Sequence, residues 1–122
     1  CATAFSQRAI IDALEGPQDD VAAMREEFRG RRKVFVEGLR SVPGITCSMP
    51  EGAFYAFASI AGTGLSSDQF ENRALDEAGV ACLSGAGFGK YGEGYVRLSY
   101  ANSVQNLQEA VARLKTFVSR ID

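Results

Sequence analysis

One arginine stands inside an otherwise apolar and aromatic segment of this 122-residue chain. Residues 94–101 read Gly-Tyr-Val-Arg-Leu-Ser-Tyr-Ala, with Arg97 near the centre. A guanidinium in such a run is costly unless it meets an anion. Its planar fork of N–H donors suits a carboxylate, which it binds through two parallel hydrogen bonds. Arg97 is therefore a candidate ligand-binding residue, and the alternative is an ion pair with one of the chain's own Asp or Glu residues.

A glycine-dense loop, residues 85–94, leads into this segment. Residues 87–92 match the pattern G-x-G-x-x-G, which binds dinucleotides when a strand precedes it and a helix follows. Here a strand is expected to follow, so the match does not indicate a dinucleotide site. A kinase-type loop is excluded because the chain has no histidine for the catalytic-loop motif. We interpret residues 85–94 as a pliable loop whose glycines permit positive φ and close backbone approach.

The residue types that are missing exclude several kinds of chemistry. Without histidine, the chain has no Ser-His or Cys-His nucleophile pair and no His-ligated zinc. Cys1, Cys47 and Cys82 are odd in number and widely spaced, which favours a reducing, cytoplasmic setting. We expect Cys47 and Cys82 in the core rather than as reactive thiols. A formal net charge of −2 and the lack of a long apolar run favour neither nucleic acid nor a membrane as partner.

Periodicity, caps and turn residues predict the elements that position Arg97, in the order α-α-β-β-α-β-β-α. Helices are expected over residues 3–15, 19–39, 67–78 and 103–121, and strands over residues 45–48, 53–57, 80–83 and 94–101. Ser66 and Gln69 form a capping box for the third helix, and Gly79 ends it. The order predicts an α+β domain, with a small mixed or antiparallel sheet covered mainly on one face by helices.

Three patterns leave alternatives open. The last helix has an apolar stripe formed by Val104, Leu107, Val111, Leu114, Val118 and Ile121. The stripe suits a helix laid across a sheet, and less well a coiled coil that would make the chain an interaction domain. The basic run at residues 29–33 is interpreted as a solvated helix face with intrahelical ion pairs. Along residues 53–57, alternation places Phe54 opposite Tyr55 and Phe57, so that one of these sets is available to a ligand.

Several segments together resemble the fold-type I, class I pyridoxal-phosphate aminotransferases, and most of all the aspartate aminotransferase-like bacterial and archaeal enzymes. The resemblance spans nearly the whole chain, and its strongest part is the run that contains Arg97. The segments, in the family's order, are Gly16-Pro17-Gln18, Arg31-Arg32, Pro43-Gly44, residues 50–55, residues 78–81, Gly87-Phe88-Gly89 and residues 95–101.

The resemblance implies that the chain is the C-terminal part of such an enzyme. Residues 1–16 would be a helical lead-in from a missing large domain, and residues 17–122 the C-terminal small domain. Arg97 matches the arginine that binds the substrate's α-carboxylate. The segments near the active-site mouth in the family correspond to Gly52, Phe54, Gly87, Phe88 and Gly89.

The resemblance also implies what the chain lacks. The family's Schiff-base lysine and most of its pyridoxal 5'-phosphate contacts lie upstream, and Lys33, Lys90 and Lys115 are not in that motif. Cys1-Ala2 replaces a common Asn-Pro, which weakens the case for a contact with the neighbouring subunit's cofactor. The complete enzyme is expected to be a homodimer acting on an amino acid and a 2-oxo acid, and this chain alone to be inactive. A free-standing module that binds small carboxylates without catalysis stays the alternative.

Overall fold

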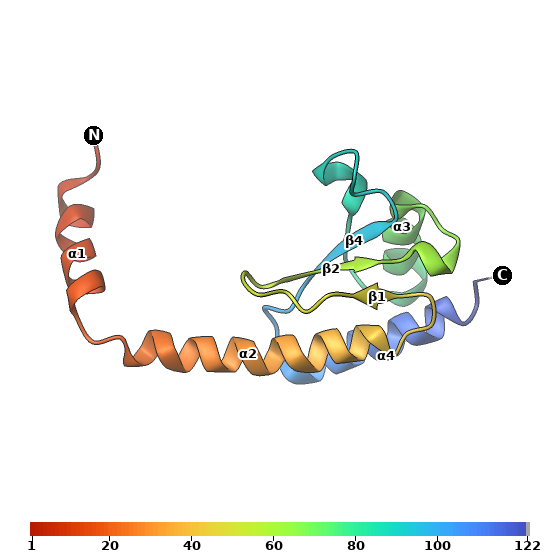
Figure 1. Ribbon diagram of the computed structural model, residues 1–122, viewed down its shortest axis with the longest axis horizontal. Helices are drawn as coiled ribbons and strands as arrows, with labels where there is room; N and C mark the ends of the chain where they lie inside the picture. Colours follow the sequence, from red (N-terminus) through yellow and green to blue (C-terminus); the bar gives the residue numbers. More distant parts are fainter. Residues whose placement is uncertain (122) are drawn as a thin grey trace.

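The computed structural model describes residues 1–121 and confirms the predicted order of helices and strands (Figure 1). Two short 3₁₀ turns, η1 and η2, lie between these elements. The elements are α1 (Ala4–Glu15), α2 (Asp19–Arg40), β1 (Thr46–Cys47), β2 (Tyr55–Ser59), η1 (Ala61–Thr63), α3 (Ser67–Ala78), β3 (Leu83–Ser84), η2 (Gly85–Phe88), β4 (Tyr95–Ser99) and α4 (Val104–Val118).

The four strands form one sheet in the order β1-β2-β4-β3, and each neighbouring pair is antiparallel. β1 and β2 make the expected hairpin-like pair, with Cys47 opposite Ala58. β4 lies between β2 and β3, so Arg97 has Phe57 on one side and Leu83 on the other. Arg97 is thus the middle residue of a central strand.

Helices cover one face of this sheet. Along β2 and β4, alternate residues are buried, namely Ala56, Ala58, Val96 and Leu98, and they face the layer formed by α2, α3 and α4. Residues between them on the other face, such as Phe57 and Tyr95, are 40% and 37% exposed. The predicted α+β class with one covered face is therefore confirmed.

α4 belongs to the core of the domain. It runs beside α2 (Figure 1) and buries Leu107, Leu114 and Val118, half of the predicted stripe, along with Phe117. Gly38 on α2 permits close approach, because a Cβ at this position would lie 2.8 Å from a methyl group of Val111. The stripe is used within the chain, which favours the helix-on-sheet interpretation over a coiled coil.

Two strands begin two or three residues later than predicted, each for a local reason. β2 begins at Tyr55 rather than Ala53, because Ala53 has a φ of 58° and lies outside the extended region. β3 begins at Leu83 rather than Val80, because the Val80 amide donates to Ala74 O and completes the end of α3. The capping box of Ser66 and Gln69 and the left-handed Gly79 at the C-terminus of α3 are as predicted.

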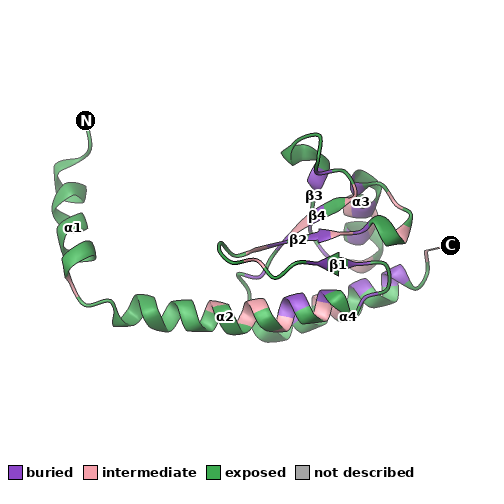
Figure 2. Cartoon of the chain, viewed as in Figure 1, coloured by how far each residue is buried: buried purple, intermediate pink, exposed green. Residues whose placement is uncertain are grey.

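α1 and the first half of α2 lie apart from the core, and Figure 2 shows them exposed. Apolar side chains are among those exposed, including Phe5 at 77% and Leu14 at 76%. Within residues 1–121, no helix is both long and apolar enough to cross a membrane.

Candidate carboxylate-binding site

Arg97 lies on the uncovered face of the sheet and is half-buried. Its neighbours in sequence, Val96 and Leu98, point into the core, so alternation along β4 turns Arg97 outward. It borders a hollow of about 160 Å³ lined by Tyr55, Ala81, Cys82, Leu83, Arg97 and Ser99. The guanidinium is therefore sheltered by the domain and still reachable from one side.

Two aromatic rings contact the guanidinium. Its central carbon lies 4.4 Å from the ring centroid of Tyr55 and 4.5 Å from that of Phe88, over both rings. Within residues 1–121, neither an ion pair nor a side-chain hydrogen bond involves Arg97. The intramolecular salt bridge considered from the sequence is absent from this part of the chain, and the N–H donors of Arg97 are available to a ligand.

The glycine-dense loop brings Phe88 to Arg97. η2 ends at Phe88, and Gly89 follows with a φ of 117°, a conformation that residues with a side chain rarely adopt. Gly85 and Gly92 touch through their backbones, since a Cβ on either would collide with the other's carbonyl oxygen. The predicted close approach and positive φ are both present.

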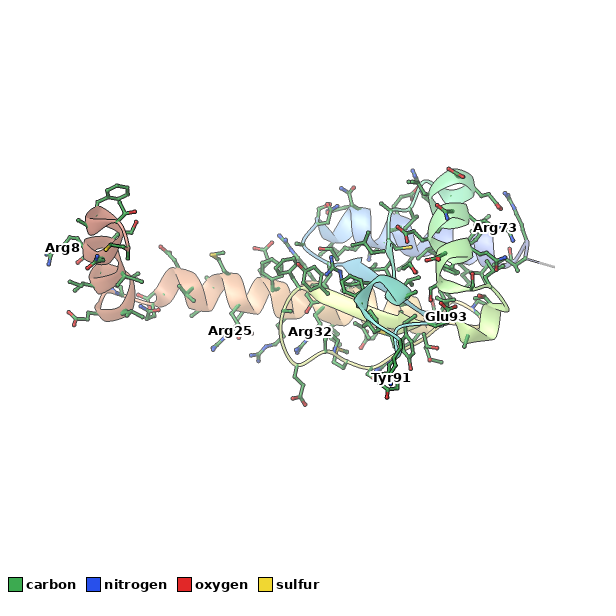
Figure 3. All side chains as sticks on the ribbon, turned by 90° about the horizontal axis from the view of Figure 1, so that it is seen from above. Arg8, Arg25, Arg32, Arg73, Tyr91 and Glu93 are labelled. Atoms are coloured by element: carbon green, nitrogen blue, oxygen red, sulfur yellow. The ribbon has the colours of Figure 1, made fainter. Side chains whose placement is uncertain are left out.

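Residues at the start of α3 anchor this loop. The Ser67 hydroxyl is fully buried, accepts hydrogen bonds from the amides of Gly94 (2.8 Å) and Tyr95 (3.2 Å), and donates to Gly92 O (3.4 Å). The Glu93 carboxylate accepts from the Ser67 amide at 3.0 Å, where the positive end of the helix dipole favours an anion. Figure 3 shows Glu93 beside α3 and Tyr91 at the outer edge of the molecule.

A second set of contacts fixes the turn before β2. Arg32 donates to Pro50 O at 2.8 Å, and the buried Tyr100 hydroxyl donates to Ala53 O at 2.8 Å. Arg32 thus departs from the solvated face predicted for the basic run, whereas Arg29 and Arg31 form the expected ion pairs with Glu26 and Glu27. Arg32 lies where α2 meets the sheet, and Arg25 lies in the first half of α2, away from the sheet (Figure 3).

The buried cysteines are not anionic partners for Arg97. Burial, with a smaller contribution from the Glu71 carboxylate, raises the pKa of the Cys82 thiol to about 12. Burial also raises the pKa of Cys47, against the opposing charge of Arg40. Both thiols are neutral near pH 7, as expected for core residues.

The candidate site residues do not all lie together. Phe88 contacts Arg97, with Gly87 and Gly89 beside it in the loop. Phe54 packs against Tyr55, with 4.2 Å between ring centroids, and contacts Arg97 only through that ring. Gly52 lines a different hollow, together with Phe28, Arg32 and Tyr100.

Sequence reasoning missed the contact between Tyr55 and Arg97. The alternation of Tyr55 and Phe57 indicated a shared face, but only the pairing of β2 with β4 shows that this is also the face of Arg97. The nearby Phe57 ring stacks on Tyr95, with 5.2 Å between centroids. Arg97 therefore sits on an open face that is largely aromatic.

The fold and the site define an α+β domain with an arginine on the open face of its sheet, and the N–H donors of this arginine have no partner among residues 1–121. The family model for aminotransferases of class I and II matches residues 1–114. The chain belongs to this family.

Individual proteins that resemble this chain in sequence or in structure are also aminotransferases. The aspartate aminotransferase of Pyrococcus horikoshii is 44% identical over 113 residues, covering 91% of this chain and 29% of that protein. The crystal structure of the Rhizobium meliloti aspartate aminotransferase matches 100% of this chain and 32% of its own, with a TM-score of 0.92 and 35% identity. An alanine aminotransferase from Pyrococcus furiosus matches with the same TM-score and 32% identity, over 98% of this chain and 30% of its own. The chain spans about a third of the length of these proteins.

Proposed function

We propose that this chain is the C-terminal small domain of a pyridoxal-phosphate-dependent aminotransferase and that Arg97 binds the α-carboxylate of the substrate. The complete enzyme transfers an amino group between an α-amino acid and a 2-oxo acid, and residues 17–122 form its small domain. The single observation that carries this role is an arginine on a sheltered sheet face whose N–H donors have no partner among residues 1–121. The family membership supplies the reaction class.

The chemistry assigned to Arg97 is binding and orientation. Two parallel N–H···O bonds fix both oxygens of a carboxylate and hence the direction of the bond to the α-carbon. Holding the reacting carbon in one orientation contributes to catalysis by proximity. The neighbouring Tyr55 and Phe88 rings shield the guanidinium from water on their sides, which strengthens its pairing with an anion.

Pyridoxal 5'-phosphate, when bound, supplies the electron sink for this reaction. The residues around Arg97 do not fit the cofactor, because, among residues 1–121, no lysine that could form a Schiff base lines their hollow. We therefore assign most of the cofactor contacts to the part of the protein outside this chain. This chain alone is expected to be inactive, and its place in a homodimer is part of the same proposal.

The test is substitution of Arg97 in the complete enzyme. Charge-assisted hydrogen bonds are worth about 1.5–3 kcal/mol, so Arg97→Ala is expected to lower kcat/KM for the amino acid by about 10- to 150-fold. Arg97→Lys keeps the positive charge but loses the planar fork of donors. It should lower kcat/KM less than Arg97→Ala does. Steady-state kinetics with the preferred amino acid gives both values.

Arg113→Ala is the matched control. Arg113 pairs with Glu109 on α4, on the helical side of the sheet, with half of its side chain exposed. Its removal should change kcat/KM by less than about twofold, since exposed pairs of this kind contribute little. An Arg97→Ala enzyme with the same kcat/KM as Arg113→Ala would show that Arg97 does not bind the substrate.

A further inference from the structure

We infer that Tyr55 and Phe88 act as an aromatic clamp, defined as these two rings on either side of the Arg97 guanidinium, which makes the site selective for planar carboxylates. This inference rests on the proposed function, because it concerns how Arg97 recognises its ligand. Tyr55 and Phe88 are positioning residues: they hold the guanidinium, and its N–H groups hold the ligand.

The two rings reach Arg97 from different directions. Tyr55 is paired with Ser99 in the sheet, one alternation step beyond Arg97 toward the end of β4. Phe88 contacts Phe57 edge-on, with 6.2 Å between centroids, and Phe57 stacks on Tyr95, one step before Arg97. The guanidinium carbon lies over both rings, and within residues 1–121 no ring contact joins Tyr55 to Phe88, so the two rings approach it from different directions.

This arrangement leaves the N–H edge as the open part of the guanidinium. A planar carboxylate can lie in the guanidinium plane and accept two parallel hydrogen bonds at that edge. A tetrahedral sulfonate that binds in the same way places a third oxygen out of the plane, toward a ring. Aromatic faces carry partial negative charge, so this oxygen is repelled. The clamp thus favours carboxylates over tetrahedral anions.

Each ring is held from its own side of the site. Tyr55 packs against Phe54, and Phe54 contacts Phe28 on α2 with 6.5 Å between ring centroids. Phe88 is held by η2, in the loop that Ser67 anchors. The plane of Arg97 is therefore set by contacts from α2 through Tyr55 and from the glycine-dense loop through Phe88.

The experiment compares two competitive inhibitors of the complete enzyme, propionate and its tetrahedral counterpart ethanesulfonate. Phe88→Leu and Tyr55→Leu remove the ring faces, and each is expected to lower the ratio of ethanesulfonate Ki to propionate Ki by at least about threefold. Both should also lower kcat/KM for the amino acid by about 2- to 30-fold, the range of a cation–π contact. The Ki ratio does not depend on the fraction of active enzyme, so a merely structural defect leaves it unchanged.

Conservative and matched variants complete the test. Phe88→Tyr and Tyr55→Phe keep the ring faces and should retain the wild-type ratio within about twofold. Tyr91→Leu removes an exposed ring of the same loop that contacts Lys90 rather than Arg97, and it should change nothing. If the leucine variants keep the wild-type Ki ratio, or if the conservative variants lose it equally, the clamp is refuted.

Failure of the clamp and failure of the proposed function are distinguishable. If propionate inhibits Arg97→Ala as well as wild type, Arg97 is not the carboxylate site, and both proposals fall. If Arg97→Ala abolishes inhibition by propionate while both leucine variants behave as wild type, only the clamp falls.

Discussion

At the residue scale, the hollow beside Arg97 keeps its positive charge free for a ligand. Cys82 lines the same hollow, and a thiolate there would pair with the guanidinium. Burial instead holds the thiol in its neutral form, with a pKa of about 12. Tyr55 and Phe88 contribute ring faces and no full charge. The cation is sheltered without being neutralised.

The raised pKa of Cys82 predicts how stability depends on pH. Below pH 9.0, the ordinary value, the thiol is protonated in both the folded and the unfolded chain. Between pH 9.0 and about 12 it ionises mainly in the unfolded chain, so the unfolded state binds fewer protons and the free energy of unfolding falls. The full effect of one group is about 1.4 kcal/mol per pH unit in this range.

Urea unfolding between pH 8 and pH 11 measures this effect. Cys82→Ala should show a shallower loss of stability above pH 9 than wild type, whatever its offset at pH 8. Cys1→Ala removes an exposed thiol and should follow the wild-type slope. Parallel curves for wild type and Cys82→Ala would refute the assignment.

At the element scale, α3 and the glycine-dense loop form one unit. The N-terminus of α3 binds the Glu93 carboxylate through the Ser67 amide, and the Ser67 hydroxyl joins three backbone groups of the loop. Glu71 on the same helix accepts from the Ser84 amide at 2.7 Å, just before η2. α3 thereby fixes both ends of the loop that carries Phe88.

Ser67→Ala tests this coupling. The substitution leaves the Gly94 amide without its acceptor in a part-buried site, and it should cost about 1–3 kcal/mol of unfolding free energy. Ser41→Ala is the control, because the Ser41 hydroxyl is exposed and donates only to Gly38 O. Urea midpoints compare the two. If Ser67→Ala lowers the free energy of unfolding no more than Ser41→Ala does, the glycine-dense loop is held in another way.

The same elements show what the sequence could predict. The Ser66–Gln69 box and the Gly79 cap were predictable because their partners lie within a few residues. The role of Ser67 was not, since its partners are 25 to 28 residues away and pairing of that kind leaves no local pattern. For the site, the type and context of Arg97 indicated an anion ligand, but Tyr55 and Arg32 acquired their contacts only through the sheet register and helix packing.

At the scale of the whole molecule, the chain exposes apolar surface that a stable protein would cover. α1 buries none of its residues, and Phe5, Ile10 and Leu14 are all largely exposed. A helix of 12 residues that buries none of its side chains is marginal in water. Val21 and Met24 continue the exposed apolar surface along α2. The rest of an aminotransferase, about two thirds of the length of the relatives, is the cover that we propose.

The proposal that this chain is one domain of a complete aminotransferase is tested by the mass and activity of the natural gene product, isolated from its source cells with an antibody against this chain. A chain that spans about 30% of its relatives predicts a protein about three times larger than 13.1 kDa. The isolated protein should also transfer amino groups between an α-amino acid and a 2-oxo acid. A product near 13.1 kDa without this activity would contradict the account, and the free-standing carboxylate-binding module would then take its place.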